Sequence, residues 1–185
     1  AYLNVPPFIA TLAMMEIVYG IGLIVTNATP LGGYVEAYTN VANKKFLGIN
    51  YLIWIALVVA AITWFIFNMT RHGKYMYAIG GNPQAAEVAG VPVKATMILI
   101  YMKAAAMYGL AGFMLGAKAG GASVQTGYGY EMEAIAACTI GGVSVTGGRG
   151  KVSSAIIGVA VFELLKAALQ YLGVDANAQY IAIGI

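Results

Sequence analysis

The chain has 185 residues, of which 61% are hydrophobic and 9% are charged, and its formal net charge is +3. Together with a mean hydropathy of +0.79, this composition excludes an ordinary soluble domain and predicts a membrane protein. One cysteine and one histidine exclude an internal disulfide and leave no cluster for a metal ion. The ten basic residues are scattered between apolar runs, so they indicate topology in the bilayer rather than binding to nucleic acid.

Apolar runs predict an all-α, polytopic transmembrane bundle that belongs to a single domain covering residues 1–185. The expected spans, in chain order, are residues 8–26, 46–70, 95–117, 132–145, 152–173 and the start of a further span at 178–185. The second has no charged residue and would form a helix of roughly 37 Å, enough to cross a hydrocarbon core of about 30 Å. The run at 132–145 is short and predicts a partial or re-entrant helix. We expect the chain to be part of a larger protein, because it lacks a starting methionine and ends within an apolar run.

The lysine and arginine residues predict how the spans are oriented. Arg71, Lys74 and Lys94 bracket the connection between the second and third spans, so residues 70–94 are expected in the cytoplasm. The connections at 27–45 and 118–130 should then lie outside. If the short run at 132–145 crosses the membrane, Arg149 and Lys151 return to the cytoplasmic side.

A short surface helix is predicted within this cytoplasmic connection. Gly80 and Gly81 favour a turn, Asn82 is a good helix N-cap, and Pro83 suits the first helical position. Residues 84–89 favour a helix that Gly90 can end. The small side chains at Ala85, Ala86 and Ala89 would allow close contact with another protein.

A second glycine-rich stretch follows the short run, and it does not match a nucleotide-binding motif. A P-loop needs Ser or Thr after Gly-Lys, but Val152 follows Lys151, and the first glycine is replaced by Val145. A dinucleotide fingerprint fails because Met132 stands where a third glycine is required. Packing and a sharp turn at membrane depth are the better interpretation. The glycines concerned are Gly141, Gly142, Gly147, Gly148 and Gly150.

Charged residues inside the spans are the remaining candidates. Glu163 and Lys166 lie three residues apart on one helical face and are expected to pair. Lys103 and Glu16 have no such neighbour, so each could reach an interface or line a wet cavity. Polar and aromatic side chains are as plausible as these charges along a path through the membrane. These are Tyr19, Asn50, Tyr101 and Tyr108.

Three ordered motifs are similar to the permease subunits of bacterial ATP-driven (ABC) sugar importers of the ribose and galactose type. They are GKYMYAIGGNPQAAEVAGVPVK, YEMEAIAACTIGGVSVTGGRGKV and LQYLGVDANAQYIAIGI. The resemblance covers essentially the whole chain as the later half of such a permease, and the galactose branch looks closest.

The resemblance implies a multi-pass protein of the bacterial inner membrane that forms the path for a neutral monosaccharide and performs no chemistry itself. It implies three partners: a separate ATPase that binds ATP and magnesium, a soluble sugar-binding protein, and a second permease copy. No cofactor is expected in this subunit. The short cytoplasmic helix would dock on the ATPase through Gly80, Gly81, Asn82, Pro83, Ala85, Ala86, Glu87 and Gly90.

Two other functions stay open. An ion- or proton-coupled secondary transporter would use the intramembrane charges at Glu16, Lys103, Glu163 and Lys166. An intramembrane enzyme is the third alternative, but the spans contain no paired aspartates, no histidine cluster and no Ser/His set.

Overall fold

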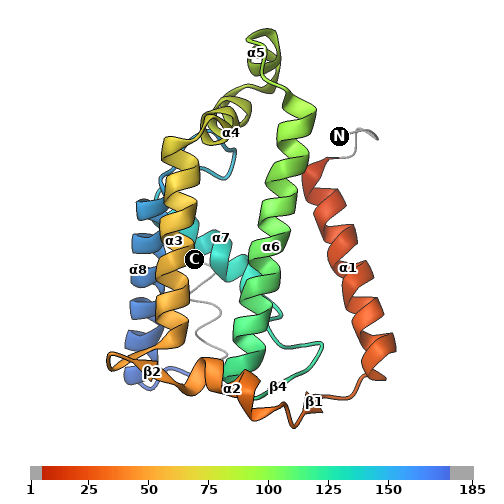
Figure 1. Ribbon diagram of the computed structural model, residues 1–185, viewed down its shortest axis with the longest axis vertical. Helices are drawn as coiled ribbons and strands as arrows, with labels where there is room; N and C mark the ends of the chain where they lie inside the picture. Colours follow the sequence, from red (N-terminus) through yellow and green to blue (C-terminus); the bar gives the residue numbers. More distant parts are fainter. Residues whose placement is uncertain (1–5, 176–185) are drawn as a thin grey trace. The chain divides into compact units, whose positions relative to one another are not determined.

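The computed structural model describes residues 6–175, and these are mainly helical (Figure 1). Four of the described helices are long and apolar enough to cross a membrane. They are α1 (Pro7–Thr26), α3 (Tyr51–Met69), α6 (Val93–Ala119) and α8 (Val152–Tyr171). The shorter helices are α2 (Glu36–Asn43), α4 (Arg71–Gly81), α5 (Pro83–Val88) and α7 (Tyr130–Ile140). The predicted all-α membrane architecture is confirmed for these residues, whereas the run expected at 178–185 lies outside them.

The strands of the described residues are two residues long each and form two antiparallel pairs. In the first pair, β1 (Leu31–Gly32) lies beside β4 (Gly121–Ala122). The second pair joins β2 (Lys45–Phe46) to β3 (Ile49–Asn50) in a tight hairpin. The first pair holds the connections at 27–45 and 118–130 together, so both lie on the same side of the membrane, as expected from the topology.

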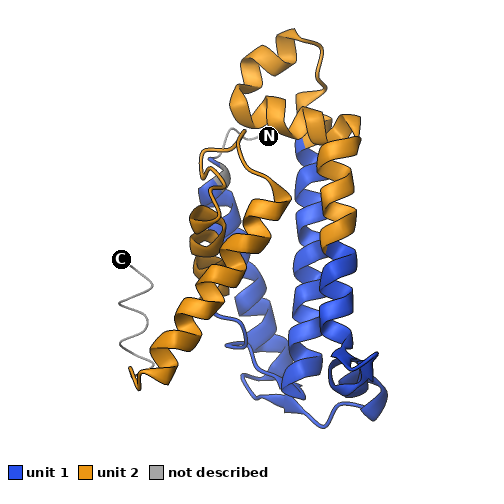
Figure 2. Cartoon of the chain, turned by 90° about the vertical axis from the view of Figure 1, so that its left-hand side faces the viewer, with its two compact units in different colours: residues 1–59, 97–128 blue, residues 60–96, 129–185 orange. Residues whose placement is uncertain are grey.

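The chain divides into two compact units, which Figure 2 shows in different colours. Among the described residues, the first unit comprises residues 6–59 and 97–128, and the second comprises residues 60–96 and 129–175. The boundary between the units falls within α3 and α6.

In the first unit, α2 packs against α6 through Tyr38. Its hydroxyl donates a hydrogen bond to the carbonyl oxygen of Phe113 at 2.7 Å, and the two ring centroids are 4.8 Å apart. A glycine makes this approach possible, because a Cβ at Gly116 would lie 2.5 Å from the Tyr38 hydroxyl oxygen. The contact therefore anchors the amphipathic α2 to the end of a membrane-spanning helix.

The span expected to begin at Phe46 begins instead at Tyr51. Phe46 pairs with Ile49 in the β2–β3 hairpin, which turns the chain before the helix. Asn50 then caps α3, since its Oδ1 accepts a hydrogen bond from the Leu52 amide at 2.9 Å. Its Nδ2 donates to the Ala42 carbonyl oxygen at 2.6 Å. The side chain of Asn50, considered above for the transport path, is thus bound in a structural cap.

Candidate functional site

In the second unit, a helix that sequence analysis did not predict connects α3 to the short surface helix. This helix, α4, begins after Thr70, whose Oγ1 accepts a hydrogen bond from the Gly73 amide at 3.1 Å. The bend between α3 and α4 needs a glycine, because a Cβ at Gly73 would collide with the carbonyl oxygens of Ile66 and Phe67. A Thr N-cap before a polar stretch was the signal that could have identified α4.

The short surface helix predicted at Pro83 is present as α5. Asn82 caps it, because its Oδ1 accepts hydrogen bonds from the amides of Gln84 and Ala85, both at 3.0 Å. Gly90 ends it in the left-handed conformation, with φ +83°. Two backbone hydrogen bonds complete this helix end. The Gly90 amide donates to the Glu87 carbonyl oxygen and the Val91 amide donates to the Ala86 carbonyl oxygen, both at 3.0 Å. Caps at both ends hold this six-residue helix in a defined shape.

The outward face of α5 differs from the one expected. Ala86, expected on the contact face, is only 4% exposed and packs into its own chain. Val88, which the sequence analysis did not select, is 91% exposed. Ala85 and Glu87 are also exposed. The helix therefore presents an apolar side chain at its tip with small and charged neighbours.

The glycine-rich stretch after α7 forms an ordered loop. α7 ends at Ile140 instead of Val145, and at about 1.5 Å per residue its 11 residues cover roughly 16 Å. Gly142 has φ +80°, and the Val143 amide closes the helix end by donating to the Cys138 carbonyl at 3.0 Å. Further along, the Ser144 amide donates to the Arg149 carbonyl at 2.9 Å. The loop at residues 141–151 is consequently held by its own backbone hydrogen bonds.

This loop lies in direct backbone contact with the end of α4. A Cβ placed on Gly80 would collide with the Gly148 amide nitrogen and lie 2.9 Å from the Gly148 Cα. Conversely, a Cβ on Gly148 would lie 2.7 Å from the Gly81 amide nitrogen. Gly147 and Gly148 also have positive φ values of 89° and 72°. Gly80, expected as part of a docking surface, is therefore an internal packing position.

A tyrosine on α4 adds a second link between the same two segments. The Tyr77 hydroxyl donates a hydrogen bond to the Gly150 carbonyl oxygen at 2.8 Å. Its ring lies edge-on to Phe67 of α3, with centroids 5.7 Å apart. The loop that carries Arg149 and Lys151 therefore lies beside α4, which begins at Arg71, and the cytoplasmic position of these basic residues stays a prediction.

Replacing Tyr77 by phenylalanine is expected to remove this link while keeping the ring contact with Phe67. Loss of one hydrogen bond to the backbone should lower the free energy of unfolding by about 0.5–1.5 kcal/mol. Thermal unfolding of the purified protein in detergent measures the effect. Tyr75→Phe is the matched control, because no hydrogen bond from the Tyr75 hydroxyl is found within residues 6–175. Equal stability of Tyr77→Phe and Tyr75→Phe would contradict the assignment.

Helices α7 and α8 pack with their backbones in contact. A Cβ on Gly158 of α8 would collide with the Ala137 carbonyl oxygen of α7. A Cβ on Gly141 would likewise collide with the Ser154 carbonyl oxygen. Small residues allow such close packing where no hydrophobic effect drives helices together. The loop and α8 therefore form one packed body with α7.

The expected pairing of Lys166 with Glu163 is wrong. The Lys166 Nζ instead forms an ion pair with Oε2 of Glu133 on α7 at 2.8 Å, and the two side chains are 27% and 22% exposed. The ammonium also lies 5.6 Å from the centre of the Phe162 ring. Glu163 is exposed. Helix spacing allowed the local pair, but the packing of α7 against α8 offers Lys166 a less exposed carboxylate.

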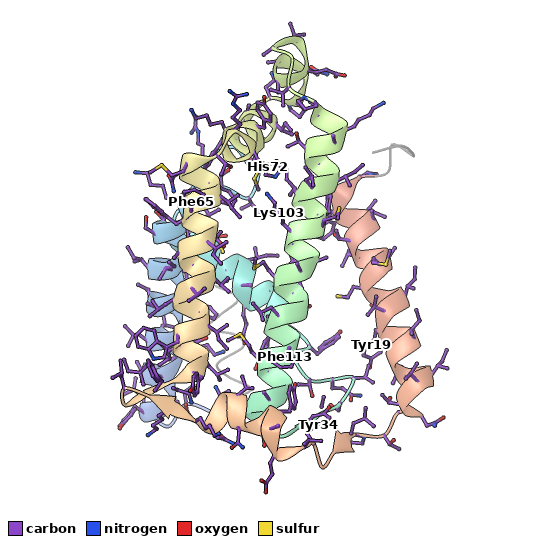
Figure 3. All side chains as sticks on the ribbon, viewed as in Figure 1. Tyr19, Tyr34, Phe65, His72, Lys103 and Phe113 are labelled. Carbon is purple, nitrogen blue, oxygen red and sulfur yellow. The ribbon has the colours of Figure 1, made fainter. Side chains whose placement is uncertain are left out.

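Two further candidates, Lys103 and Tyr108, lie on α6 in the first unit. Lys103 is half-buried on α6, where Figure 3 labels it, and none of the described carboxylates forms an ion pair with it. Tyr108 is 73% exposed on the same helix. A role for either residue in a transport path stays a prediction. No group of His, Cys, Asp and Glu that could hold a metal ion occurs in the part of the chain that the structure describes.

Comparisons with known proteins relate the chain to permease components of transport systems. The family model described as branched-chain amino acid transport system / permease component matches residues 1–185. The chain is 40% identical over its full length to the galactose/methyl galactoside import permease protein of Haemophilus influenzae, of which it covers 57%. It is 33% identical over its full length to the L-arabinose transport system permease protein of Escherichia coli, covering 56%.

A ribose import permease protein of Haemophilus influenzae is 32% identical over 97% of the chain. The chain covers 57% of that relative and so spans little more than half the length of these curated proteins. No solved structure matches the chain.

Proposed function

Because the chain belongs to the family of branched-chain amino acid transport system / permease components, we propose that it forms the membrane path of an ATP-driven importer. The names of the three relatives mention galactose, arabinose and ribose, respectively. We propose a neutral monosaccharide as the cargo, with galactose or glucose favoured by the higher identity to the galactose relative. The subunit would lie in the bacterial inner membrane and leave ATP hydrolysis to a separate ATPase.

The observation that carries this proposal is the architecture of α4, α5 and the 141–151 loop. α5 is capped at both ends and presents the 91%-exposed Val88 at its tip. An exposed apolar anchor on a rigid short helix suits docking into a groove of a partner protein. An unsupported loop could not transmit a displacement of that partner.

The contacts behind α5 supply the support that force transmission needs. Gly80 packs against Gly148, Tyr77 is hydrogen-bonded to Gly150, and the loop continues into the packed α7–α8 pair. A displacement of α5 would therefore move α4, the loop and α8 together as a packed body. We propose this route from the ATPase to the transport path, with a soluble sugar-binding protein and a second permease copy completing the importer.

A secondary transporter has less support. One of the features that suggested it was the pairing of Glu163 with Lys166 within one helix, but Lys166 instead forms an ion pair with Glu133 on the neighbouring helix. An interhelical ion pair of this kind serves packing, and it does not supply the relay of titratable groups that proton coupling uses.

Val88→Asp is expected to separate the permease from its ATPase. In an apolar groove of the ATPase, a carboxylate at the tip of α5 would lose its water without gaining a partner. Docking should therefore weaken, and ATP-driven uptake should fall at least about tenfold. The measurement uses the full-length permease with its ATPase and binding protein in proteoliposomes loaded with ATP, following radiolabelled galactose and the ATPase retained by tagged permease. Val88→Ile, which keeps an apolar side chain, should stay close to wild type.

Two results would count against the proposal. Val88→Asp permease that retains the ATPase and full uptake would remove α5 from the docking surface. Uptake by the wild type that ignores internal ATP and collapses with an uncoupler would instead favour an ion-coupled transporter.

A further inference from the structure

In the first unit, the connection between α6 and α7 folds back along α1. A Cβ on Gly22 of α1 would lie 3.5 Å from Cγ1 of Val124, and the rings of Tyr19 and Tyr128 are 6.4 Å apart. Gly22 and Tyr19 are three residues apart and share one face of α1. The connection therefore follows α1 toward its middle, on the half where Figure 3 labels Tyr19.

The returning connection has a fixed conformation. The Ser123 amide donates to Oγ1 of Thr126 at 2.8 Å, and the Thr126 amide donates to the Ser123 carbonyl oxygen at 2.9 Å. The Tyr128 amide donates to the Gln125 carbonyl oxygen at 3.0 Å. Irregular backbone at membrane depth is tolerated where protein or a water-filled cavity surrounds it.

An open pocket of ≈ 230 Å³ lies between α1 and this connection. It is smaller than the range of about 300–1,000 Å³ typical of sites for drug-sized ligands, so it suits a smaller molecule. Glu16 lies ten residues before the end of α1, which is roughly 15 Å along the helix. An ionisable side chain at that depth in a membrane helix marks a functional position more often than a packing one. The pocket is lined by Met15, Glu16, Tyr19, Gln125 and Tyr128.

The lining combines two kinds of group that a sugar ring requires. The Tyr19 and Tyr128 rings are inclined at 55°, so they form an apolar corner for the C–H face of a pyranose. The Glu16 carboxylate accepts hydrogen bonds, and the Gln125 amide both donates and accepts them, as sugar hydroxyls do. In residues 6–175, neither the Glu16 carboxylate nor the Gln125 side-chain amide has a hydrogen-bond partner. Both groups are therefore available to a polar, uncharged ligand.

We propose that this pocket is a contact site for a neutral monosaccharide on its way through the membrane. The proposal rests on the proposed import function and adds the residues that meet the sugar. Tyr19 and Tyr128 stack on the ring, while Glu16 and Gln125 bind its hydroxyls. With the orientation expected from the basic residues, the pocket extends from about the middle of α1 toward its outer end, on the side from which the sugar enters the permease.

Cysteine protection tests this assignment directly. Gln125→Cys is made in full-length permease with Cys138→Ala and any other cysteine replaced, and a membrane-impermeant maleimide labels it from outside. D-Galactose should slow labelling severalfold, whereas sorbitol, a polyol with no ring, should not. Leu31→Cys on β1, a side chain that is 49% exposed and outside the pocket, is the control whose labelling should stay constant.

Transport kinetics supply a second test. Tyr19→Ala should lower galactose uptake about tenfold at saturating binding protein, while Tyr19→Phe keeps the ring and most of the activity. Phe8→Ala truncates another exposed aromatic side chain of α1, which lies outside the pocket and should have little effect. If the Tyr19→Ala variant does not reach the membrane, the labelling of Gln125→Cys tests the pocket assignment by itself.

The outcomes separate this proposal from the import function. ATP-driven uptake by the wild type, together with galactose-insensitive labelling of Gln125→Cys, would overturn the pocket assignment alone. Uptake that needs no ATP, with labelling still slowed by galactose, would overturn the ABC assignment and leave the sugar site standing.

Discussion

Gly80→Val is expected to abolish ATP-driven uptake and to destabilise the permease. The added side chain would meet the Gly148 backbone, with the Gly148 Cα already 2.9 Å from a Cβ at this position. Backbone on both sides cannot rotate out of the way, so α4 and the loop must separate. Overpacking of this kind costs about 1–3 kcal/mol, and here it also breaks the route from α5 to α8. Galactose uptake and thermal unfolding in detergent measure the two effects.

The neighbouring glycine provides a matched control for this experiment. No atom lies within 4 Å of a Cβ placed on Gly81, and its φ is not in the left-handed region. Gly81→Ala should therefore leave uptake unchanged and stabilise the last turn of α4 by up to about 0.5–1 kcal/mol. Wild-type uptake in Gly80→Val would show that the contact with Gly148 is not needed for transport.

Lys166→Met is expected to destabilise the packing of α7 against α8. Removing the ammonium leaves the Glu133 carboxylate, which is only 22% exposed, without its ion-pair partner. Exposed ion pairs contribute about 0.2–1 kcal/mol, and breaking a buried one costs about 3–5 kcal/mol. For this intermediate exposure we expect a loss of about 1–3 kcal/mol in the free energy of unfolding, measured by thermal unfolding in detergent.

A double-mutant cycle separates the ion pair from general effects of the substitutions. Glu133→Gln with Lys166→Met should recover part of the stability lost in either single variant, because no unpaired charge is left. Glu163→Gln is the control and should be nearly neutral, because Glu163 is exposed and forms no ion pair with Lys166. Additive losses in the cycle, or a larger loss in Glu163→Gln, would contradict the pairing.

Features that depend on residues close together in the sequence were predictable from the sequence. The four described membrane helices could be predicted from the length of the apolar runs alone. In lipid, the backbone N–H and C=O groups must form hydrogen bonds within the segment, and a helix does this. Asn82, Pro83 and Gly90 specify the start and end of α5 because capping acts over three or four residues. Misplaced boundaries, such as the start of α3 at Tyr51, arose where a hairpin interrupts an apolar run.

The identity of the residues that meet was decided by the tertiary structure. Lys166 has Glu163 three positions away, yet it binds Glu133, which is 33 positions away. Ala86 and Val88 look equally suited to a surface helix, but only the position of α5 against α4 makes one buried and the other 91% exposed. Gly80 and Gly148 both favour turns by themselves, and their backbone contact exists only because α4 meets the 141–151 loop. Local propensity acts along the chain, whereas these contacts depend on how helices pack, so the sequence determined the spans and caps and the tertiary structure decided the site.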